Sequence, residues 1–278
     1  MKRLRPFGQL NTMRQNQLLI PKAQTIGASD FQYFDMSAWD SALELSDHPS
    51  TEVIRDGDRT IVVIDNVLRN PYHFREMLIN GAPAIDCRWH PQDYSPGHRQ
   101  AYDYRLFYPI HNLAKAAYQK TYLLAALGFK VNFEVQWGKS FTNIYQKNMQ
   151  VPVLSTQPHC DGFNFVWSLW LTDEQEAGGT SFWSYKNERY FENLEECEKE
   201  KFKQRVEALK DAEHLTHYTN PKPTAAWKME YLSEMKFNRL LIYPGRSFHA
   251  PHLPAGCFEK TIRYALVSMG DSRMTSGY

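Results

Sequence analysis

The chain has 278 residues, 42% of them hydrophobic and 23% charged, which is enough for one large domain or two small ones with a buried core. Its 32 basic and 31 acidic side chains leave a formal net charge of +1, so a dedicated nucleic-acid-binding protein or a polybasic membrane anchor is not expected. The longest apolar run, Phe163 to Leu171, is far shorter than the roughly 18 residues of a membrane-spanning helix. Composition therefore predicts a soluble globular protein with no nucleic-acid or membrane partner.

The cysteines and the N-terminus bear on the cellular location. Four cysteines lie far apart and form no CxxC pair, so we expect reduced thiols in a reducing compartment; they are Cys87, Cys160, Cys197 and Cys257. The first residues are basic, but no apolar segment of the kind found in a secretory signal follows them. The cytoplasm is therefore the expected location.

The sequence of the first half of the chain predicts an N-terminal extension followed by a helical lobe. Residues 1–57 have weak periodicity and read as an N-terminal extension, whereas residues 58–130 are expected to form a lobe of one strand and two helices that packs on a core. The β-branched run from Thr60 to Ile64 predicts a buried strand in this lobe. Residues 84–110 are rich in aromatic and turn-forming residues and are interpreted as a long loop.

Two helices are predicted in the lobe from their start and stop signals. Asn70 and Pro71 begin the first, with asparagine as the cap and proline in the first turn, and Gly81 ends it. The second is predicted over residues 112–127, with Gly128 as its stop signal.

From residue 131 onward the pattern favours a β-sheet core, residues 131–278. Hydrophobic residues alternate with polar ones from Val131 to Trp137, and Gly138 is expected to end that strand. Residues 193–217 are densely charged and predict a solvated helix inserted between strands. The fold class is therefore α+β, with a sandwich or barrel core. Further strands are predicted over Phe141–Gln146, Phe163–Leu171, Thr180–Tyr185, Arg239–Tyr243 and Ile262–Met269.

One sequence, His159-Cys160-Asp161, has the residue types and spacing of a metal site. On extended backbone, side chains two positions apart lie on the same face, so the imidazole and the carboxylate can bind one ion. Two neutral imidazoles and one carboxylate on one face of an ion form the non-haem Fe(II) arrangement. The motif alone is weak, because 10 histidines and 31 acids in 278 residues predict about one chance match.

Later features strengthen the hypothesis of a metal site. Gly178 and Gly179 open the next strand after an acidic turn, and the strand that ends at Tyr243 is followed by a turn and then His249. Arg263 lies inside the last predicted strand. A guanidinium on an interior strand face is costly to bury unless it meets an anion, and a dicarboxylate would provide one.

This order of features resembles the Fe(II)/2-oxoglutarate-dependent dioxygenase superfamily over roughly residues 131–270. The strand and helix before it look like the lead-in of prolyl-hydroxylase-like members, and the chain looks similar to a group of uncharacterised putative oxygenases related to proteins that accompany tryptophan halogenases. The resemblance implies a double-stranded β-helix core, that is, a jelly-roll of cupin-like form. It also implies three iron ligands, an arginine for the distal carboxylate of 2-oxoglutarate and a hydroxyl donor to that cosubstrate: His159, Asp161 and His249, then Arg263, then Tyr145.

The distal histidine remains open between two residues. His249 and Arg263 are 14 positions apart, a longer separation than is usual in the superfamily, whereas His252 is 11 positions from Arg263. The lead-in of tyrosine and proline before His249 fits the superfamily better, so we expect His249 to be the ligand.

The implied activity is hydroxylation of an unidentified small molecule or peptide, with Fe(II) as cofactor, 2-oxoglutarate and O2 as cosubstrates, and succinate and CO2 as products. An intact Asp161 favours hydroxylation over halogenation. Two alternatives stay open: a cupin-like metal-dependent enzyme that does not use 2-oxoglutarate, and a non-catalytic jelly-roll binding module. The sequence does not indicate an oligomeric state.

Overall fold

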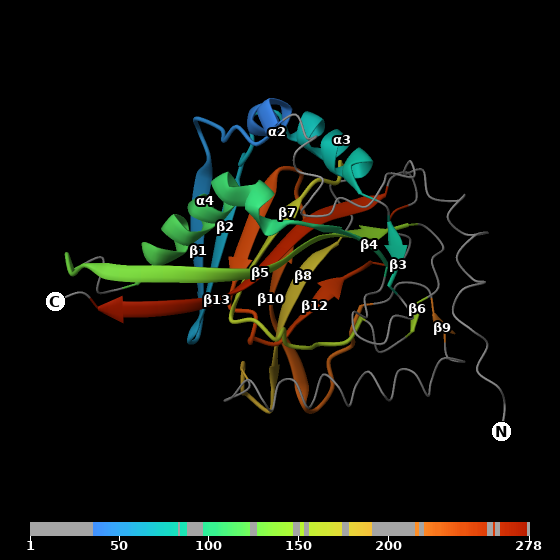
Figure 1. Ribbon diagram of the computed structural model, residues 1–278. Helices are drawn as coiled ribbons and strands as arrows, with labels where there is room; N and C mark the ends of the chain where they lie inside the picture. Colours follow the sequence, from blue (N-terminus) through green and yellow to red (C-terminus); the bar gives the residue numbers. More distant parts are fainter. Residues whose placement is uncertain are drawn as a thin grey trace, which may run out of the picture.

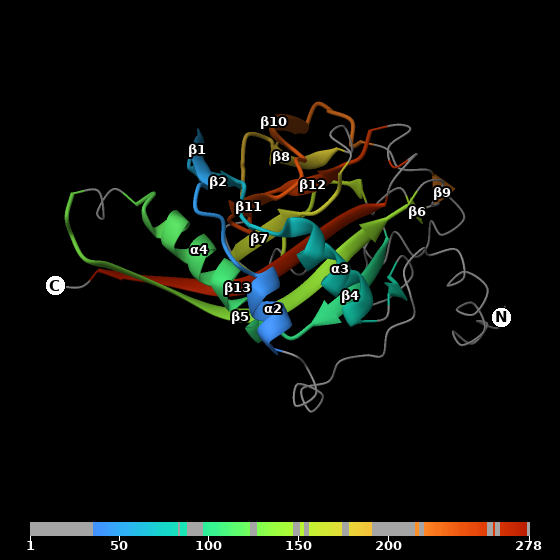
Figure 2. The same ribbon diagram turned by 90° about the horizontal axis from the view of Figure 1, so that it is seen from above.

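The chain folds into three layers, which are helices, a large antiparallel sheet and a small antiparallel sheet (Figures 1 and 2). The large sheet has the strand order β1-β2-β11-β7-β13-β5-β4-β3, the small sheet has the order β10-β8-β12, and β6 pairs with β9. Strands far apart in the chain thus lie side by side. The computed structural model describes residues 36–82, 84–87, 97–122, 127–146, 151–152, 156–173, 178–190, 215–216, 220–254, 258 and 262–276.

Helices are few and short in the described part of the chain. The helices are α2 (Met36–Ala42), α3 (Pro71–Gly81), the 3-10 helix η4 (Tyr104–Phe107) and α4 (Tyr108–Gln119). None of these described helices qualifies as a membrane span by length and hydropathy. The strands are β1 (Ser50–Asp56), β2 (Arg59–Asp65), β3 (Ile85–Asp86), β4 (His98–Tyr102), β5 (Val131–Tyr145), β6 (Val151–Pro152), β7 (Phe165–Trp170), β8 (Gly179–Tyr185), β9 (Leu215–Thr216), β10 (Trp227–Glu234), β11 (Arg239–Tyr243), β12 (His249–His252) and β13 (Arg263–Ser276).

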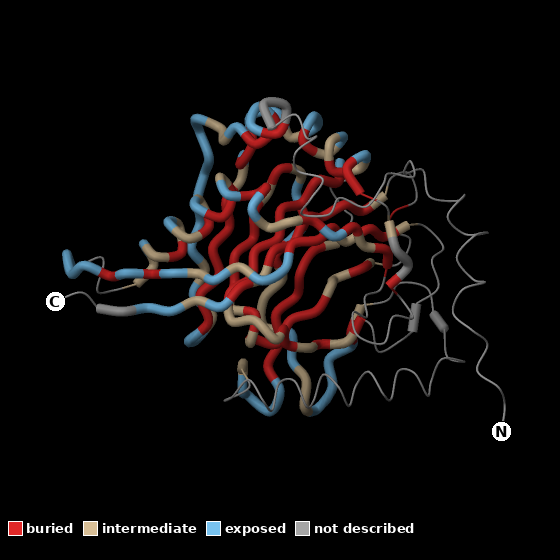
Figure 3. The backbone as a smooth tube through the Cα atoms, viewed as in Figure 1, coloured by how far each residue is buried: buried red, intermediate tan, exposed pale blue. Residues whose placement is uncertain are grey.

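The central strands of the large sheet are buried on both faces, as the red core in Figure 3 shows, whereas β1 and the first half of β5 are largely exposed. Alternate side chains of its strands point to opposite faces. In β7, Trp167 and Leu169 pack in the cluster beneath the helices, whereas Val166 and Trp170 pack in the cluster between the two sheets. Because both faces need apolar side chains, the central strands are almost continuously hydrophobic.

The candidate site lies on the inner face of the large sheet, which is the face turned toward the small sheet. Residues of β13 alternate in the same way, with Leu266 beneath the helices and Ala265 and Val267 between the sheets. By this alternation Arg263 lies on the inner face with Ala265. The predicted site residues can therefore meet between the two sheets.

Most predicted elements are confirmed, and two local expectations about the helices are corrected. The predicted strand at Thr60–Ile64 is β2, and the predicted helix from Pro71 to Gly81 is α3. Asn70 precedes that helix but makes no side-chain capping hydrogen bond. The second predicted helix forms as α4, which starts four residues earlier than expected and ends at Gln119.

Gly138 does not end a strand, contrary to the prediction. β5 continues through it to Tyr145 and pairs with β13 on both sides of Gly138, which the pairing skips because the register shifts between Met269 and Gly270. A Cβ on Gly138 would lie 2.7 Å from the ring of Phe163. Glycine is therefore required here by close packing and not by a turn, which the local sequence does not distinguish.

The region expected to be one long loop, residues 84–110, contains β3, β4, η4 and the start of α4. β4 joins the large sheet beside β5, so the pairing with an existing strand edge decides its conformation. β10 was also not predicted. The predicted charged helix at 193–217 lies outside the described residues except for Leu215–Thr216, which form β9.

His111 is a buried histidine that stabilises the interface between α4 and the large sheet. Its Nε2 lies 2.9 Å from the carbonyl oxygen of Tyr104, and its Nδ1 accepts a hydrogen bond from Trp167 Nε1 at 3.0 Å. The imidazole stacks on Trp137 at 3.8 Å between ring centroids. Burial lowers the pKa of His111 to about 4 because the charged form would lose its hydration.

We expect the free energy of unfolding to fall as the pH drops from about 6.5 towards 4. In that window the unfolded chain protonates His111, whose ordinary pKa is near 6.5, whereas the folded chain does not. This residue alone should lower the free energy of unfolding by roughly 2 kcal/mol between pH 7.5 and pH 5. Urea unfolding at both pH values measures the loss, and His111→Gln should lose less between them. Equal losses in the two proteins would contradict the assignment.

Candidate metal centre

His159 and His249 are brought together by backbone pairing between two distant segments. The backbone N–H of each donates to the carbonyl of the other at 2.8 Å, which makes an isolated antiparallel bridge beside β12. The two ring centroids lie 4.7 Å apart. Asp161 lies two residues after His159, and its Oδ2 is 3.2 Å from Nε2 of His249. Among the described residues, these three form the group that could hold a metal ion, with donor atoms within 4.8 Å of one another.

Both imidazoles are oriented by backbone carbonyls. Nδ1 of His159 lies 3.0 Å from the carbonyl oxygen of Gln157, and Nδ1 of His249 lies 2.9 Å from that of Ser247. A carbonyl oxygen can only accept, so in the neutral form of each imidazole Nδ1 carries the proton and Nε2 is left with the lone pair that a metal ion needs. Metal-binding histidines in proteins characteristically have the ring nitrogen opposite the metal engaged in this way.

Asp161 is fixed by the turn that precedes β12. Its backbone N–H donates to the carbonyl of Gly245 at 2.7 Å. Gly245 permits this approach, because a Cβ there would lie 2.3 Å from the carbonyl oxygen of Phe163. Asp161 and His249 are each only 5% exposed. Two nitrogen donors and one carboxylate oxygen therefore meet in a largely dry interior, which suits a divalent transition-metal ion.

Arg263 and Tyr145 are direct partners on adjacent strands of the large sheet. They are paired in register between β13 and β5, and the Arg263 Cζ lies 4.6 Å from the centroid of the Tyr145 ring. Arg263 is 4% exposed, and its Nε and Nη1 have no hydrogen-bond partner within the described residues. A buried guanidinium with unsatisfied donors is costly, so this position favours an anionic ligand.

Tyr243 is a site residue that the sequence analysis did not single out. It ends β11, and its ring lies 4.9 Å from the imidazole of His249. Burial raises the pKa of the Tyr243 phenol well above its usual value; the charge of Asp161 raises it further, and Arg263 lowers it. The phenol therefore stays neutral and can act as a hydrogen-bond donor. Its place at the end of a strand just before a Pro-Gly turn is the signal that could have indicated it.

His252, the alternative ligand, is not brought to the other three. It lies at the end of β12, where its Nε2 is 3.2 Å from Nδ2 of Asn220. Residues three apart on a strand point to opposite faces, so His249 and His252 cannot both face the interior. The structure therefore places His249 with His159 and Asp161.

Cys160 differs from the expectation of four reduced thiols. It is disulfide-bonded, so that expectation is wrong for this residue. Cys87 is buried and is not part of a disulfide, and Cys197 and Cys257 lie outside the described residues. A disulfide joins residues that are distant in the sequence, and spacing alone does not reveal such a contact.

The chain is similar to several solved structures, at low similarity. IDO from Bacillus thuringiensis has a TM-score of 0.29 and 11% identity over 63% of this chain, which spans only 57% of that protein. HygX from Streptomyces hygroscopicus, solved with nickel and 2-oxoglutarate, has a TM-score of 0.41 and 12% identity over 78% of this chain and 83% of HygX. SnoK, a non-heme alpha-ketoglutarate-dependent carbocyclase from nogalamycin biosynthesis, has the same TM-score and identity, over 78% of this chain and 81% of SnoK. None of these assigns a function to this chain.

No curated protein matches the sequence. A protein family does match, described as a family of unknown function, DUF6445, over residues 47–258. That match covers most of the chain, including His159, Asp161 and His249. The protein is therefore a member of the DUF6445 family.

Proposed function

We propose that this protein is an Fe(II)- and 2-oxoglutarate-dependent oxygenase that hydroxylates a small molecule or a peptide. The observation that carries the proposal is the convergence of His159, Asp161 and His249, with both Nδ1 atoms engaged by backbone carbonyls. Two imidazole nitrogens and one carboxylate oxygen would hold Fe(II) on one face and leave the opposite positions open. Bound iron would supply the activation of O2 and, with 2-oxoglutarate, the oxidation of the substrate with release of succinate and CO2.

The strand order supports a double-stranded β-helix as the core of this oxygenase. The middle of the large sheet runs β11-β7-β13-β5, and the facing small sheet runs β10-β8-β12, extended by the bridge between His159 and His249. Two antiparallel sheets are thereby connected by repeated crossings, as in a jelly-roll. In this arrangement His249 belongs to the small sheet, His159 is bridged to it, and Arg263 lies on the inner face of the large sheet.

Arg263 supports 2-oxoglutarate as the cosubstrate. A guanidinium presents a planar fork of donors that matches a carboxylate, and two of its nitrogens have no partner among the described residues. The distal carboxylate of a dicarboxylic keto acid would satisfy them. The adjacent phenols of Tyr145 and Tyr243 could donate further hydrogen bonds to the same cosubstrate. A metal-dependent enzyme that does not bind a dicarboxylate has no use for a buried arginine at this position.

Anaerobic addition of Fe(II) and then 2-oxoglutarate to the purified protein tests the proposal. We expect a weak visible charge-transfer band that appears only when both are present, because the keto acid chelates the bound iron. Succinate, which has both carboxylates but no keto group, is the matched control and should give no band. Fe(II) binding without a band would favour the cupin-like metalloenzyme, and failure to bind Fe(II) would favour a non-catalytic module. Either outcome would contradict the proposal.

A further inference from the structure

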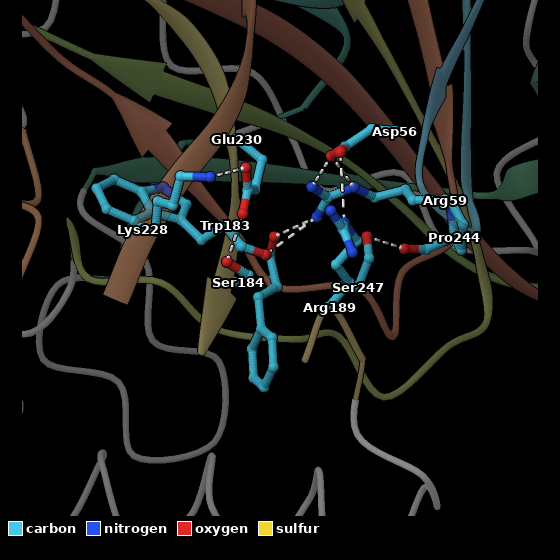
Figure 4. A network of polar contacts seen from close by, with 10 residues as sticks. Asp56, Arg59, Trp183, Ser184, Arg189, Lys228, Glu230, Pro244 and Ser247 are labelled. Carbon is cyan, nitrogen blue, oxygen red and sulfur yellow. Dashed lines mark hydrogen bonds and ion pairs between the residues drawn. The ribbon is translucent and has the colours of Figure 1, made fainter. Parts of the chain in front are cut away.

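Arg59 is a fully buried arginine at the start of β2. Its Nη1 donates to the carbonyl oxygen of Trp183 at 3.2 Å and to that of Phe248 at 3.3 Å. Its Nε donates to the carboxylate of Asp56 at 3.1 Å, and the same carboxylate accepts from Nε of Arg189 at 3.3 Å (Figure 4). One guanidinium thus joins the edge of the large sheet to β8 and to the residue just before β12.

The carbonyl of Phe248 belongs to the peptide that carries His249. Its oxygen accepts from Arg59 Nη1 and from the backbone N–H of Trp183 at 2.9 Å. The N–H at the other end of this peptide, on His249, donates to the carbonyl of His159 at 2.8 Å. The peptide is therefore held at both ends, and any movement of it would shift one imidazole relative to the other.

Arg59 also reaches the site through an aromatic contact. Its Cζ lies 5.0 Å from the centroid of the Phe182 ring. That ring is 6.5 Å from the imidazole of His249 and 5.2 Å from the ring of Tyr243, measured between centroids. The Arg59 guanidinium therefore contacts both the backbone just before His249, the proposed distal ligand, and an aromatic ring that packs near its imidazole.

Stability alone is a weak reason for an arginine at this position. Burying a guanidinium and a carboxylate removes two charges from water, and apolar replacements of similar size are often neutral or stabilising. The side chain of Arg59 is 0% exposed, and the side chain of its partner Asp56 is 14% exposed. A planar fork of five fixed donors is suited instead to holding carbonyls of separate strands in one arrangement.

We propose that Arg59 is a positioning residue for the metal centre, acting on the ion through the peptide between Phe248 and His249. The inference rests on the proposed function, because it assumes that His249 is a metal ligand. Groups that orient metal ligands without contacting the ion typically change metal affinity by 10- to 100-fold. Loss of the Arg59 fork should weaken Fe(II) binding at the lower end of that range and alter the coordination geometry.

Anaerobic titration of Fe(II) into wild type, Arg59→Met and Arg59→Lys tests this role. We expect about tenfold weaker binding in Arg59→Met and partial recovery in Arg59→Lys, which restores a buried donor without the fork. The visible spectrum of bound Co(II) supplies a second readout, because its bands report ligand geometry. Those bands should change in Arg59→Met, which a purely stabilising role would not cause.

Arg239→Met is the matched control. Arg239 of β11 pairs with Asp65 of β2, so this variant removes a partly buried arginine from the strand next to that of Arg59, and Arg239 makes no hydrogen bond to the peptide before His249 among the described residues. It should bind Fe(II) as wild type does. Unchanged Fe(II) affinity and an unchanged Co(II) spectrum in Arg59→Met would overturn the inference while leaving the proposed function intact.

Two further outcomes separate the proposals. If wild type itself binds no Fe(II), the proposed function fails, and the inference fails with it. If Arg59→Met does not fold, Asp56→Ala provides the test, because it removes the acceptor that holds the Nε of Arg59. Asp56→Ala should then show weaker Fe(II) binding, and wild-type affinity in this variant would overturn the role of Arg59.

Discussion

Replacing Asp161 with alanine should weaken Fe(II) binding by more than about 100-fold and abolish succinate formation from 2-oxoglutarate. Groups that merely orient metal ligands contribute 10- to 100-fold to affinity, so the loss of a direct ligand should exceed that range. Asp161 is also the proposed anionic ligand, and two neutral imidazoles alone bind a divalent ion weakly. Isothermal titration with Fe(II) under anaerobic conditions measures the affinity, and succinate release in air measures the uncoupled reaction.

His252→Ala is the matched control for this prediction, because His252 was the alternative ligand from the sequence. The structure places its imidazole beside Asn220 and not with the other three residues. His252→Ala should therefore bind Fe(II) as wild type does, whereas His249→Ala should fail in the same way as Asp161→Ala. Wild-type affinity in either of the latter two variants, in a folded protein, would show that the ligand assignment is wrong.

Replacing Arg263 with methionine should raise the concentration of 2-oxoglutarate needed for half-maximal turnover by roughly 30-fold or more. Removing one partner of a buried, hydrogen-bonded charge pair costs about 2–5 kcal/mol, and each 1.4 kcal/mol is tenfold in affinity. Fe(II) affinity without 2-oxoglutarate should stay near that of wild type, because Arg263 is not among the three grouped metal-binding residues. Steady-state kinetics over a range of 2-oxoglutarate concentrations measures the change.

Thermal unfolding of the Arg263 variants supplies a second readout. In the absence of 2-oxoglutarate, Arg263→Met should be at least as stable as wild type, because the guanidinium is 4% exposed and two of its nitrogens lack partners in the described part of the chain. Arg263→Lys keeps the charge without the fork and should recover part of the affinity for 2-oxoglutarate. An unchanged 2-oxoglutarate requirement in Arg263→Met would exclude the cosubstrate role and favour the cupin-like alternative.

The strands predicted from sequence form where local pattern and tertiary burial agree. β2, β7 and β11 are rich in aliphatic and aromatic residues, which fit the buried centre of the large sheet, and β8 of the small sheet contains two consecutive aromatic residues and is buried except for its last residue. β10 was missed because its exposed and partly buried positions include Lys228 and Glu230, and a polar edge strand has no distinctive local pattern. β4 was missed because its pairing with β5 overrides a sequence rich in turn-forming residues.

The candidate site divides in a similar way. The His159-Cys160-Asp161 motif, the later histidines and Arg263 can be found in the sequence. Their side chains are of types that bind metals or anions, and they lie in or next to predicted strands. Arg59 was not indicated, because its proposed role depends on contacts with residues far away in the chain. Arg59 meets the carbonyl of Phe248 across 189 positions. Such contacts follow from sheet topology and are not encoded in a local pattern.

The sequence by itself determined the residue types of the site, their order along the chain and the strand character of the core. These depend on local properties, namely side-chain chemistry, hydrophobic alternation and turn residues. Only the tertiary structure shows that His249, and not His252, lies with His159 and Asp161, because that placement depends on strand register and on the bridge to His159. It alone also showed that the Arg263 guanidinium is buried and that two of its nitrogens have no hydrogen-bond partner among the described residues, since burial is a property of the packed chain and not of any segment.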